Sequence, residues 1–431
     1  MNSKILWKAK KFQKNKSNLF KYEKFLLSKY NFKLTQNYKN LLKWSIENPK
    51  NFWSSIWDFT GVKGIKSEKL EKSKIFYKNK FLKNSKLNFA ENLLSKNDNS
   101  KAITFISESG IKENRSWKEL NRNVDKLVIF FKSIKLKEKD RVAAYLPNLI
   151  ETVEAFIATS AIGSIWSSCS PDFGARGVIE RFSQINPKVL IICDRYFYNG
   201  KEINVIERLP IILKKIKSIQ HVIVVNYPKK SLLKLIKSKK IKYTNWNSIM
   251  KIKPIRLKFK KFDFEHELAI LYSSGTTGKP KCICHRSGGV LLQHLKEHRL
   301  HNEVKENDNV FYFTTCGWMM WNWLVSALAS KASIVLFEGF PMHKRYDLLI
   351  KIADEEKITL FGVSAKYIDA LNKSNILNKK KYKLKNLRTI CSTGSPLSED
   401  GFNFIYKKVK SNVHLASISG GTDIVSCFVL G

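Results

Sequence analysis

A loop rich in hydroxyl and glycine residues is the first stretch of this sequence whose residue types could do chemistry. It runs SSGTTGKPK over 273–281 and follows the apolar run LAILY at 268–272. Hydroxyls donate hydrogen bonds, glycines let backbone N–H groups approach a ligand closely, and lysines add positive charge. This combination is typical of a loop that binds the phosphates of a nucleotide.

The loop does not fit the Walker A pattern, which requires G-x-x-x-x-G-K-[ST]. Its two glycines, Gly275 and Gly278, are only three residues apart, and Pro280 follows Lys279. A flexible glycine–serine linker is the structural alternative, but it does not explain the Lys-Pro-Lys ending or the apolar run in front. We therefore expect a clamp of hydroxyls and amides for a triphosphate. Its candidate members are Ser273, Ser274, Gly275, Thr276, Thr277, Gly278, Lys279 and Lys281.

Alternating strand and helix patterns predict the elements that must position this loop. From residue 100 onward, KAITFISE reads as a strand, SWKELNRNVDKLVIFFKSI as an amphipathic helix and DRVAAYLP as a strand. Later strands end in Gly, Ser or Thr clusters: NVFYFTT, ASIVLFEG, ITLFGVS, LRTICSTGS and VHLASISGG. This rhythm predicts an α/β fold with largely parallel sheets and flanking helices. Ligands of such folds bind at the carboxyl ends of the strands.

The composition is strongly basic, with 78 Lys and Arg against 36 Asp and Glu and a formal charge of +42 over 431 residues. Such a charge is compatible with a polyanion partner. The lysines are, however, spread along the whole chain among Asn and Ile, as in LNKSNILNKKKYKLKNL. We interpret them as a compositional bias, and no nucleic-acid-binding motif accompanies them.

Seven cysteines and a start without an apolar secretory segment, MNSKILWKAKKFQKNK, predict reduced thiols in the cytoplasm. Cys282 and Cys284 have the wrong spacing for a zinc knuckle, so we expect no metal site there. The longest apolar stretch runs from Val142 to Trp166 and contains Glu151 and Glu154. We expect no membrane span.

The motif SSGTTGKPK resembles the phosphate loop of the superfamily that forms acyl-adenylates, which includes acyl-CoA synthetases, peptide-synthetase adenylation domains and luciferases. Further segments are similar to the acetoacetate–CoA ligases in particular, and the resemblance covers nearly the whole chain. These segments are LNFAENLL, SPDFGARGVIERFSQI, FTTCGWMMWNW, FGVSAKYIDA, STGSPL and SGGTDI.

The resemblance implies ATP-dependent ligation of acetoacetate to coenzyme A through an acetoacetyl-adenylate, giving acetoacetyl-CoA, AMP and pyrophosphate. It also implies Mg²⁺ as a cofactor and the large N-terminal domain of adenylate-forming enzymes as the fold. Residues 1–95 would then form a cap region of the acyl-CoA synthetase type, and residues 96–431 the AMP-binding domain.

The resemblance assigns the phosphate loop to the β- and γ-phosphates of ATP. Thr422 matches a threonine near the α-phosphate, and Asp423 stands where many relatives carry a magnesium-binding glutamate. An aspartate keeps the oxygen ligand with a shorter reach, and a helix N-cap is the structural alternative. The candidate adenine-binding residues are Gly394, Ser395, Pro396, Ser419, Gly420 and Gly421, for which an ordinary strand-to-helix turn is the alternative.

An acyl pocket follows from the same resemblance. Acetyl-CoA synthetases carry bulky aromatics where this chain has SGG at 419–421, and the space around Gly420 suits a four-carbon β-keto acid. Trp318, Met319, Met320 and Trp321 would form the opposite wall, although such a cluster also suits a hydrophobic core. Lys366 could meet a keto oxygen or carboxylate, or simply lie on the surface.

The sequence departs from the family after Asp423, because it stops at Gly431. The family continues into a β-barrel subdomain with a Tyr-x-Thr-Gly-Asp segment and a small C-terminal domain with a late lysine. We therefore expect a C-terminally truncated chain in which no catalytic residue is identifiable and whose adenylating activity is poor. The alternatives are a ligase for another short acyl chain and an inactive nucleotide-binding remnant.

Overall fold

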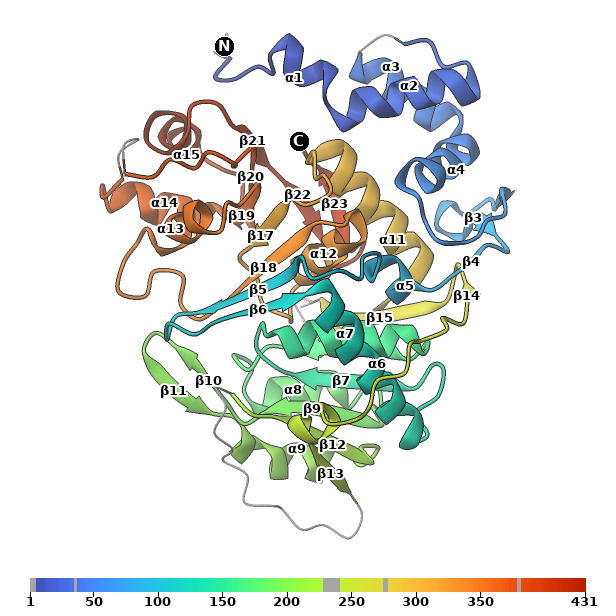
Figure 1. Ribbon diagram of the computed structural model, residues 1–431, viewed down its shortest axis with the longest axis vertical. Helices are drawn as coiled ribbons and strands as arrows, with labels where there is room; N and C mark the ends of the chain where they lie inside the picture. The colour runs from blue at the N-terminus through green and yellow to red at the C-terminus, as the bar shows by residue number, and fades with distance from the viewer. Residues whose placement is uncertain (1–4, 35–36, 228–240, 274–277, 378–380) are drawn as a thin grey trace.

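The structure is a computed structural model that describes residues 5–34, 37–227, 241–273, 278–377 and 381–431. Two seven-stranded sheets form its body (Figure 1). In order, the first sheet contains β13 (Lys242–Asn245), β12 (His221–Val225), β9 (Val189–Cys193), β7 (Arg141–Tyr145), β8 (Ile165–Cys169), β15 (Glu267–Ser273) and β16 (Lys281–Arg286). The second contains β21 (His414–Ser417), β20 (Thr389–Thr393), β19 (Leu360–Ser364), β17 (Asn309–Tyr312), β18 (Ser333–Glu338), β5 (Lys101–Ser107) and β6 (Lys112–Ser116).

Both sheets are parallel except at one edge. Only the pairs β15–β16 and β5–β6 are antiparallel within them. The strands β9 (VLIIC) and β12 (HVIVV) are buried throughout, because helices cover both faces of a parallel sheet and both faces must then be apolar. The predicted α/β fold with largely parallel sheets is confirmed.

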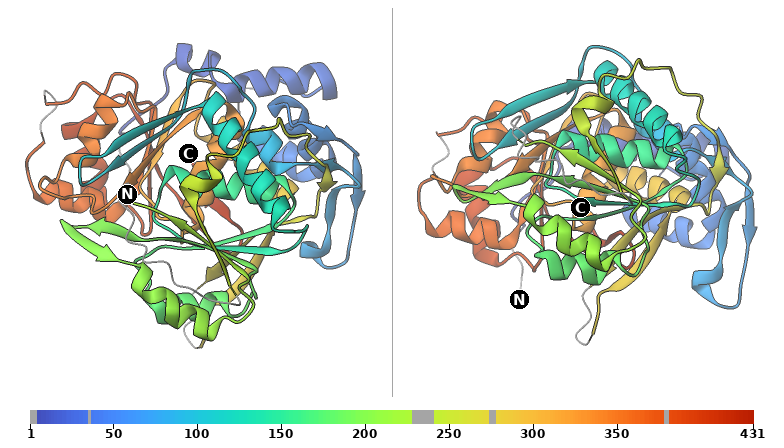
Figure 2. Two further views of the ribbon diagram at one scale, coloured as in Figure 1. Left: turned by 60° about the horizontal axis from the view of Figure 1, so that its bottom comes forward. Right: turned by 90° about the horizontal axis from the view of Figure 1, so that it is seen from below.

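Helices cover both sheets (Figures 1 and 2). Between β6 and β15 the chain forms α6 (Trp117–Ser133), α7 (Ile150–Ala161), α8 (Ala175–Phe182), α9 (Leu209–Lys215) and α10 (Trp246–Ile249), of which α6 contacts β5 and β6 of the second sheet. After β16, a strand that α11 contacts, follow α11 (Ser287–Lys296), the π-helix η3 (Glu297–His301), α12 (Met319–Ser326), η4 (Ala327–Ser330), α13 (Leu348–Glu355), α14 (Ala365–Lys373), α15 (Glu399–Phe404) and the π-helix η5 (Ile405–Val409). Helix α6 starts at a capping box, in which Ser116 Oγ accepts from the backbone N–H of Glu119.

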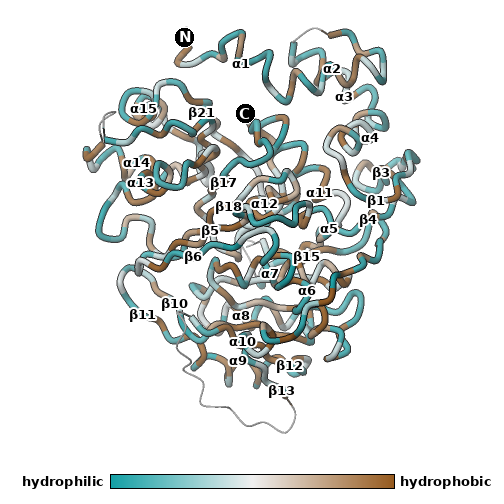
Figure 3. The backbone as a smooth tube through the Cα atoms, viewed as in Figure 1, coloured by the Kyte–Doolittle hydropathy of each residue, from teal (hydrophilic) through white to brown (hydrophobic). Residues whose placement is uncertain are grey.

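The helix α7 lies in the middle of the molecule and links the two sheets. All of its residues are buried except Glu151, which is half-buried. The ring of Phe156 lies 5.7 Å from Trp166 of β8 and 5.6 Å from Trp321 of α12. The apolar stretch of the sequence is therefore a core helix and its flanking strands, and within the described ranges no helix has the length and apolarity to cross a bilayer. Figure 3 shows hydrophobic residues along these inner strands and helices.

The N-terminal segment forms helices along one side of this body (Figure 1). The side-chain amide of Asn18, at the start of α2, donates to the carbonyls of Arg299 and Val304 at 3.1 and 3.0 Å. These bonds attach the segment to η3 and to the residues that follow it. Its elements are α1 (Lys11–Asn15), α2 (Asn18–Tyr30), α3 (Tyr38–Glu47), α4 (Pro49–Thr60), β1 (Gly64–Ile65), β2 (Lys69–Glu71), η1 (Phe76–Lys78), β3 (Lys80–Lys83), β4 (Lys86–Leu87) and α5 (Phe89–Leu93). The remaining elements are β10 (Arg195–Tyr198), β11 (Lys201–Asn204), η2 (Ile206–Arg208), β14 (Phe262–Asp263), β22 (Ser419–Gly421) and β23 (Ser426–Val429).

Candidate functional site

The predicted phosphate loop connects the two strands of an antiparallel hairpin. Ser273 at the end of β15 lies opposite Lys281 at the start of β16. Gly278 has φ +100°, a backbone conformation that strongly favours glycine, and Lys279 is exposed. The four central members of the proposed clamp, Ser274, Gly275, Thr276 and Thr277, lie outside the described residues.

Thr422 and Asp423 lie in the turn of a second hairpin, formed by β22 and β23. Gly420 is paired with Cys427, and Gly421 with Ser426. The Asp423 side chain is exposed, and Thr422 is half-buried. The predicted threonine–acid pair therefore projects from a short hairpin at the end of the second sheet, next in sequence to β21.

A buried histidine connects these two hairpins. His285 on β16 donates from Nε2 to the carbonyl oxygen of Thr422 at 2.8 Å. Burial lowers the pKa of His285, which favours the neutral ring that donates from one nitrogen only. The strand that follows the phosphate loop thus holds the Thr422 turn beside it, although the two residues are 137 positions apart in the sequence.

The predicted adenine turn lies at the end of β20. Gly394 has φ +87°, and Ser395 and Pro396 are exposed. The backbone N–H of Leu397 donates to Ser417 Oγ at 3.1 Å, and Thr393 Oγ1 donates to the carbonyl of Ile418 at 3.2 Å. These bonds place the turn beside the residues that lead into Ser419 and β22.

The predicted acyl wall follows β17, at the same carboxyl edge of the second sheet as β21. Trp318 is 63% exposed, whereas Met319 and Met320 are buried at 7% and 8% exposure. Trp321, the fourth residue predicted for this wall, is fully buried and donates from Nε1 to Asn148 Oδ1 at 2.9 Å, so it lies in the core. Lys366, another predicted contact, is exposed at the start of α14, the helix that follows β19 of the same sheet.

The glycines of β22 differ in what surrounds them. A Cβ on Gly420 would lie 2.1 Å from the carbonyl oxygen of Ser426 and 2.7 Å from Cys427 Cα. A Cβ on Gly421 would meet nothing within 4 Å. The hairpin therefore requires glycine at position 420 for its own close packing, in addition to any role in an acyl pocket, while the open space lies at Gly421.

Asp423 is compatible with a magnesium site. The described part of the chain contains no group of three or more His, Cys, Asp and Glu side chains that could hold a metal on their own. Mg²⁺ commonly binds through one or two carboxylates together with substrate phosphates and water. A single exposed carboxylate on the turn that His285 joins to the phosphate-loop hairpin fits this mode.

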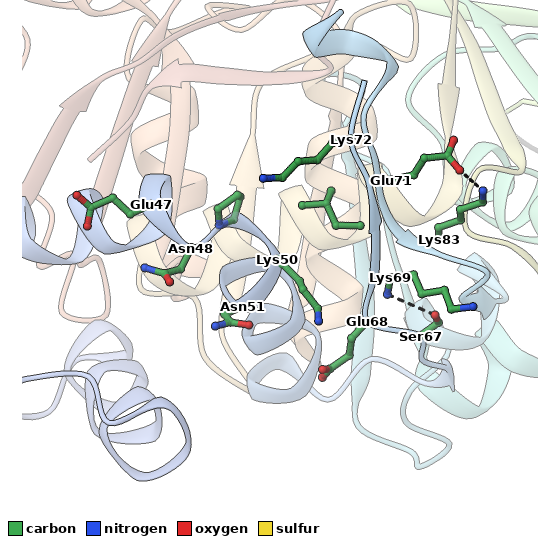
Figure 4. Close-up of a pocket in the computed structure, with 12 residues that line it drawn as sticks. Glu47, Asn48, Lys50, Asn51, Ser67, Glu68, Lys69, Glu71, Lys72 and Lys83 are labelled. Atoms are coloured by element: carbon green, nitrogen blue, oxygen red, sulfur yellow. Dashed lines mark hydrogen bonds and ion pairs between the residues drawn. The ribbon is translucent and has the colours of Figure 1, made fainter. Parts of the chain in front are cut away.

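A groove of ≈ 1100 Å³ lies elsewhere, between the start of α4 and the hairpin β2–β3 (Figure 4). Charged side chains dominate its lining, and Lys83 forms an ion pair with Glu71. Its lining residues are Glu47, Asn48, Pro49, Lys50, Asn51, Ser67, Glu68, Lys69, Leu70, Glu71, Lys72 and Lys83. None of them belongs to the predicted nucleotide motifs, so we interpret this groove as a hydrated, charged surface.

Two residues that support the site were missed by the sequence interpretation. His285 is a buried residue on a strand whose neighbours are mostly exposed, and a lone histidine in CICHR gives no sign of its partner. Gln184, just after α8, donates from Nε2 to the carbonyl of Pro280 at 2.9 Å and so fixes the end of the phosphate loop. It lies within the family-like segment 170–185, which was the only signal for it.

Comparisons with known proteins identify the family to which the chain belongs. The family model of the AMP-binding enzymes matches residues 91–429. An acetoacetyl-coenzyme A synthetase of Rhizobium meliloti (strain 1021) is 44% identical over 389 residues, which cover 90% of this chain and 59% of that relative. An acetoacetyl-CoA synthetase of Gallus gallus is 39% identical over 443 residues, covering 100% of this chain and 65% of the relative.

A solved structure is also similar. The acetoacetyl-CoA synthetase from Streptomyces lividans superposes with a TM-score of 0.92 at 30% sequence identity, over 99% of this chain and 66% of that chain. The chain thus spans 59% to 65% of the length of the two curated relatives described above.

Proposed function

Because the chain belongs to the family of AMP-binding enzymes, we propose that it forms the nucleotide- and acyl-binding part of an acetoacetate–CoA ligase. The site lies where the phosphate-loop hairpin, the adenine turn and the Thr422 hairpin meet. The relatives described above act on acetoacetate by name, and we extend that substrate to this chain.

The proposed reaction has two steps. A carboxylate oxygen of acetoacetate attacks the α-phosphorus of ATP, and the bond to the bridging oxygen breaks, releasing pyrophosphate. The thiolate sulfur of coenzyme A then attacks the carbonyl carbon of the adenylate and expels AMP, leaving a thioester. Both steps shift negative charge on phosphate oxygens, so catalysis depends mainly on positioning and on groups that stabilise that charge.

The residues of the site have distinct proposed roles. The loop between Ser273 and Lys281 binds the β- and γ-phosphates, with Lys279 supplying charge. Thr422 contacts the α-phosphate from its hairpin turn, and Asp423 would hold a Mg²⁺ ion, which neutralises phosphate charge when bound. The turn from Gly394 to Pro396, with residues 419–421, lies under the adenine.

The acyl group would lie between Trp318 and the open space beside Gly421. Trp318 is the only exposed member of the predicted wall, and the absence of a Cβ at Gly421 leaves room that an acetyl group would not need. Met319 and Met320 support the wall from the core. We take this space as support for a four-carbon β-keto acid over acetate.

We keep the division into a cap region at 1–95 and an AMP-binding domain at 96–431 as part of the proposal. We also place the protein in the cytoplasm. Its seven cysteines are all free thiols, of which five are buried, and a reducing compartment preserves such thiols.

One observation supports the proposal most directly: the 2.8 Å bond from His285 to Thr422, which joins the hairpin of the predicted phosphate loop to the predicted Thr422 turn. Its test is titration calorimetry of the 431-residue chain with ATP, in the presence and absence of magnesium. We expect magnesium-dependent binding. A chain that binds no ATP under either condition would refute the nucleotide site and the ligase with it.

A matched pair of lysine variants locates the binding. Lys279→Ala should weaken ATP affinity about tenfold or more, because a charge-assisted hydrogen bond contributes about 1.5–3 kcal/mol. Lys253→Ala removes the same charge from an exposed position outside the site and should leave the affinity unchanged. Equal effects of the two changes would mean that only the overall charge of the chain attracts ATP.

Exchange of pyrophosphate into ATP identifies the acid. We expect acetoacetate to stimulate this exchange more than acetate does. If a different short acid stimulates the exchange more than acetoacetate does, that acid is the substrate. ATP binding without any acid-stimulated exchange would favour the nucleotide-binding remnant over the ligase.

A further inference from the structure

A buried carboxylate lies behind the Thr422 hairpin, at the point where α11 continues into the π-helix η3. Glu297 has 0% exposure. Its Oε1 accepts hydrogen bonds from Gln293 Nε2 at 2.9 Å, from the hydroxyl of Ser426 and from the backbone N–H of Cys427 at 3.3 Å. Its Oε2 accepts from Trp323 Nε1 at 2.8 Å. Two of these four donors belong to β23.

The surrounding residues on α11 hold the same hairpin. His294 donates from Nε2 to the carbonyl of Val425 at 2.6 Å, and Gln293 donates to Ser426 Oγ at 2.7 Å. Figure 1 labels β22 and β23 beside α11. The hairpin is therefore fixed by side chains of one helix along β23, and by His285 at its turn.

The backbone of this hairpin is strained where these bonds converge. Val425 has φ +48°, a left-handed conformation that is a genuine outlier for a β-branched residue. Such a conformation persists only where surrounding contacts determine it. The Val425 carbonyl that accepts from His294 and the Ser426 and Cys427 groups that donate to Glu297 directly follow this strained φ along the chain.

We propose that Glu297 is a positioning residue for the nucleotide site, which sets the place of Thr422 and Asp423 through Ser426, Cys427 and the strained turn. This inference rests on the proposed ATP site and adds a residue to it that touches no substrate. A carboxylate without exposure needs its lone pairs satisfied, and hairpin and helix donors together satisfy those of Glu297. Loss of one acceptor oxygen should therefore loosen the hairpin.

The first measurement follows the hairpin itself, without any ligand. Hydrogen exchange of amides at 419–429 is compared in the unaltered chain, in Glu297→Gln and in Glu154→Gln. Glu154 is an equally buried glutamate, on α7, whose bonds go to Arg115 and Asn123. We expect exchange in the hairpin to accelerate about tenfold or more in Glu297→Gln only, since the amide group replaces a charged acceptor.

The second measurement follows nucleotide binding and turnover. Glu297→Gln should weaken Mg·ATP affinity and lower the exchange rate at saturating ATP, while KM for acetoacetate stays within about twofold, because the acyl wall at Trp318 is untouched. Glu154→Gln should change neither. Ser426→Ala removes one donor and is the milder variant if Glu297→Gln does not fold. The double variant should show non-additive loss, as expected for residues that act together.

The outcomes separate the two proposals. If the unaltered chain binds no Mg·ATP, the proposed function is refuted, and so is the role of Glu297 in nucleotide binding. If the unaltered chain binds ATP but the hairpin exchange or the ATP affinity of Glu297→Gln equals that of the unaltered chain, only the positioning role is refuted. Equal opening of the hairpin in Glu154→Gln would also refute it, because the effect would then be general destabilisation.

Discussion

Replacement of Gly420 by alanine tests whether hairpin packing demands glycine at this position. The added Cβ would lie 2.1 Å from the Ser426 carbonyl oxygen and 2.7 Å from Cys427 Cα. Both atoms belong to the backbone, so no side-chain rotation relieves the contact. Reaching an ordinary separation requires the paired strand to move by about 1 Å or more, and forced overpacking of this kind costs about 1–3 kcal/mol.

The cost should appear locally. The hairpin is a short two-stranded element outside the two large sheets and can open without global unfolding, so hydrogen exchange at 419–429 is the suitable assay. An opening free energy reduced by about 1–3 kcal/mol corresponds to exchange that is roughly 5- to 150-fold faster. Mg·ATP affinity should fall in parallel, because Thr422 and Asp423 lie in the turn that opens.

Gly421→Ala is the matched control. Its Cβ would meet nothing within 4 Å, so we expect hairpin exchange within about twofold of the unaltered chain, in line with substitutions away from special features. An equally protected hairpin in Gly420→Ala would refute the packing argument and leave ligand space as the reason for glycine. Equal acceleration in both variants would mean that backbone flexibility, not the close contact, governs the effect.

Three further predictions concern stability, each measured by urea unfolding. Burial raises the pKa of Glu154 from 4.5 to about 7, so between these pH values the folded chain keeps a proton that the unfolded chain releases. The free energy of unfolding should therefore fall by about 3 kcal/mol as the pH rises from 4.5 through 7, and Glu154→Gln should remove this pH dependence. Trp321→Phe should cost about 1–3 kcal/mol or more, because the buried Asn148 Oδ1 loses its donor, and a neutral result would mean that the core repacks to satisfy it. Lys43→Ala breaks only the exposed 3.8 Å pair with Glu47 and should change stability by less than about 0.5 kcal/mol, and a larger loss would contradict the low value assigned to surface pairs.

The fold was predictable because its signals are local. A run such as VLIIC at 189–193 predicts a strand covered on both faces, and the helical spacing of apolar residues in 117–133 predicts an amphipathic helix. Right-handed parallel connections then leave few arrangements. The Gly and Ser clusters at 394–396 and 419–421 follow β20 and β21 at the carboxyl edge of the second sheet, where the two segments lie side by side.

The links within the site were not predictable, because they depend on tertiary register. Whether His285 faces Thr422 depends on β16 pairing antiparallel to β15 at the sheet edge, with His285 opposite Ala269. A shift of one residue would turn His285 to the other face. Likewise, nothing local separates Gly420 from Gly421: only the pairing of Gly420 with Cys427 brings the backbone of β23 against one of them.

Glu297 shows how a sequence can carry a signal that composition hides. In VLLQHLKEHRLH it looks like one charge among many, in a chain where charged residues make up 26% of the sequence. Its position is nevertheless on the buried stripe of α11 and η3, which runs through Val290, His294 and Glu297 at helical spacing. A carboxylate on such a stripe destabilises the fold unless hydrogen-bond donors surround it. The presence of Glu297 there indicates that another segment must supply these donors. Here that segment is β23, and the donors on Ser426 and Cys427 satisfy the helix and fix the hairpin at once.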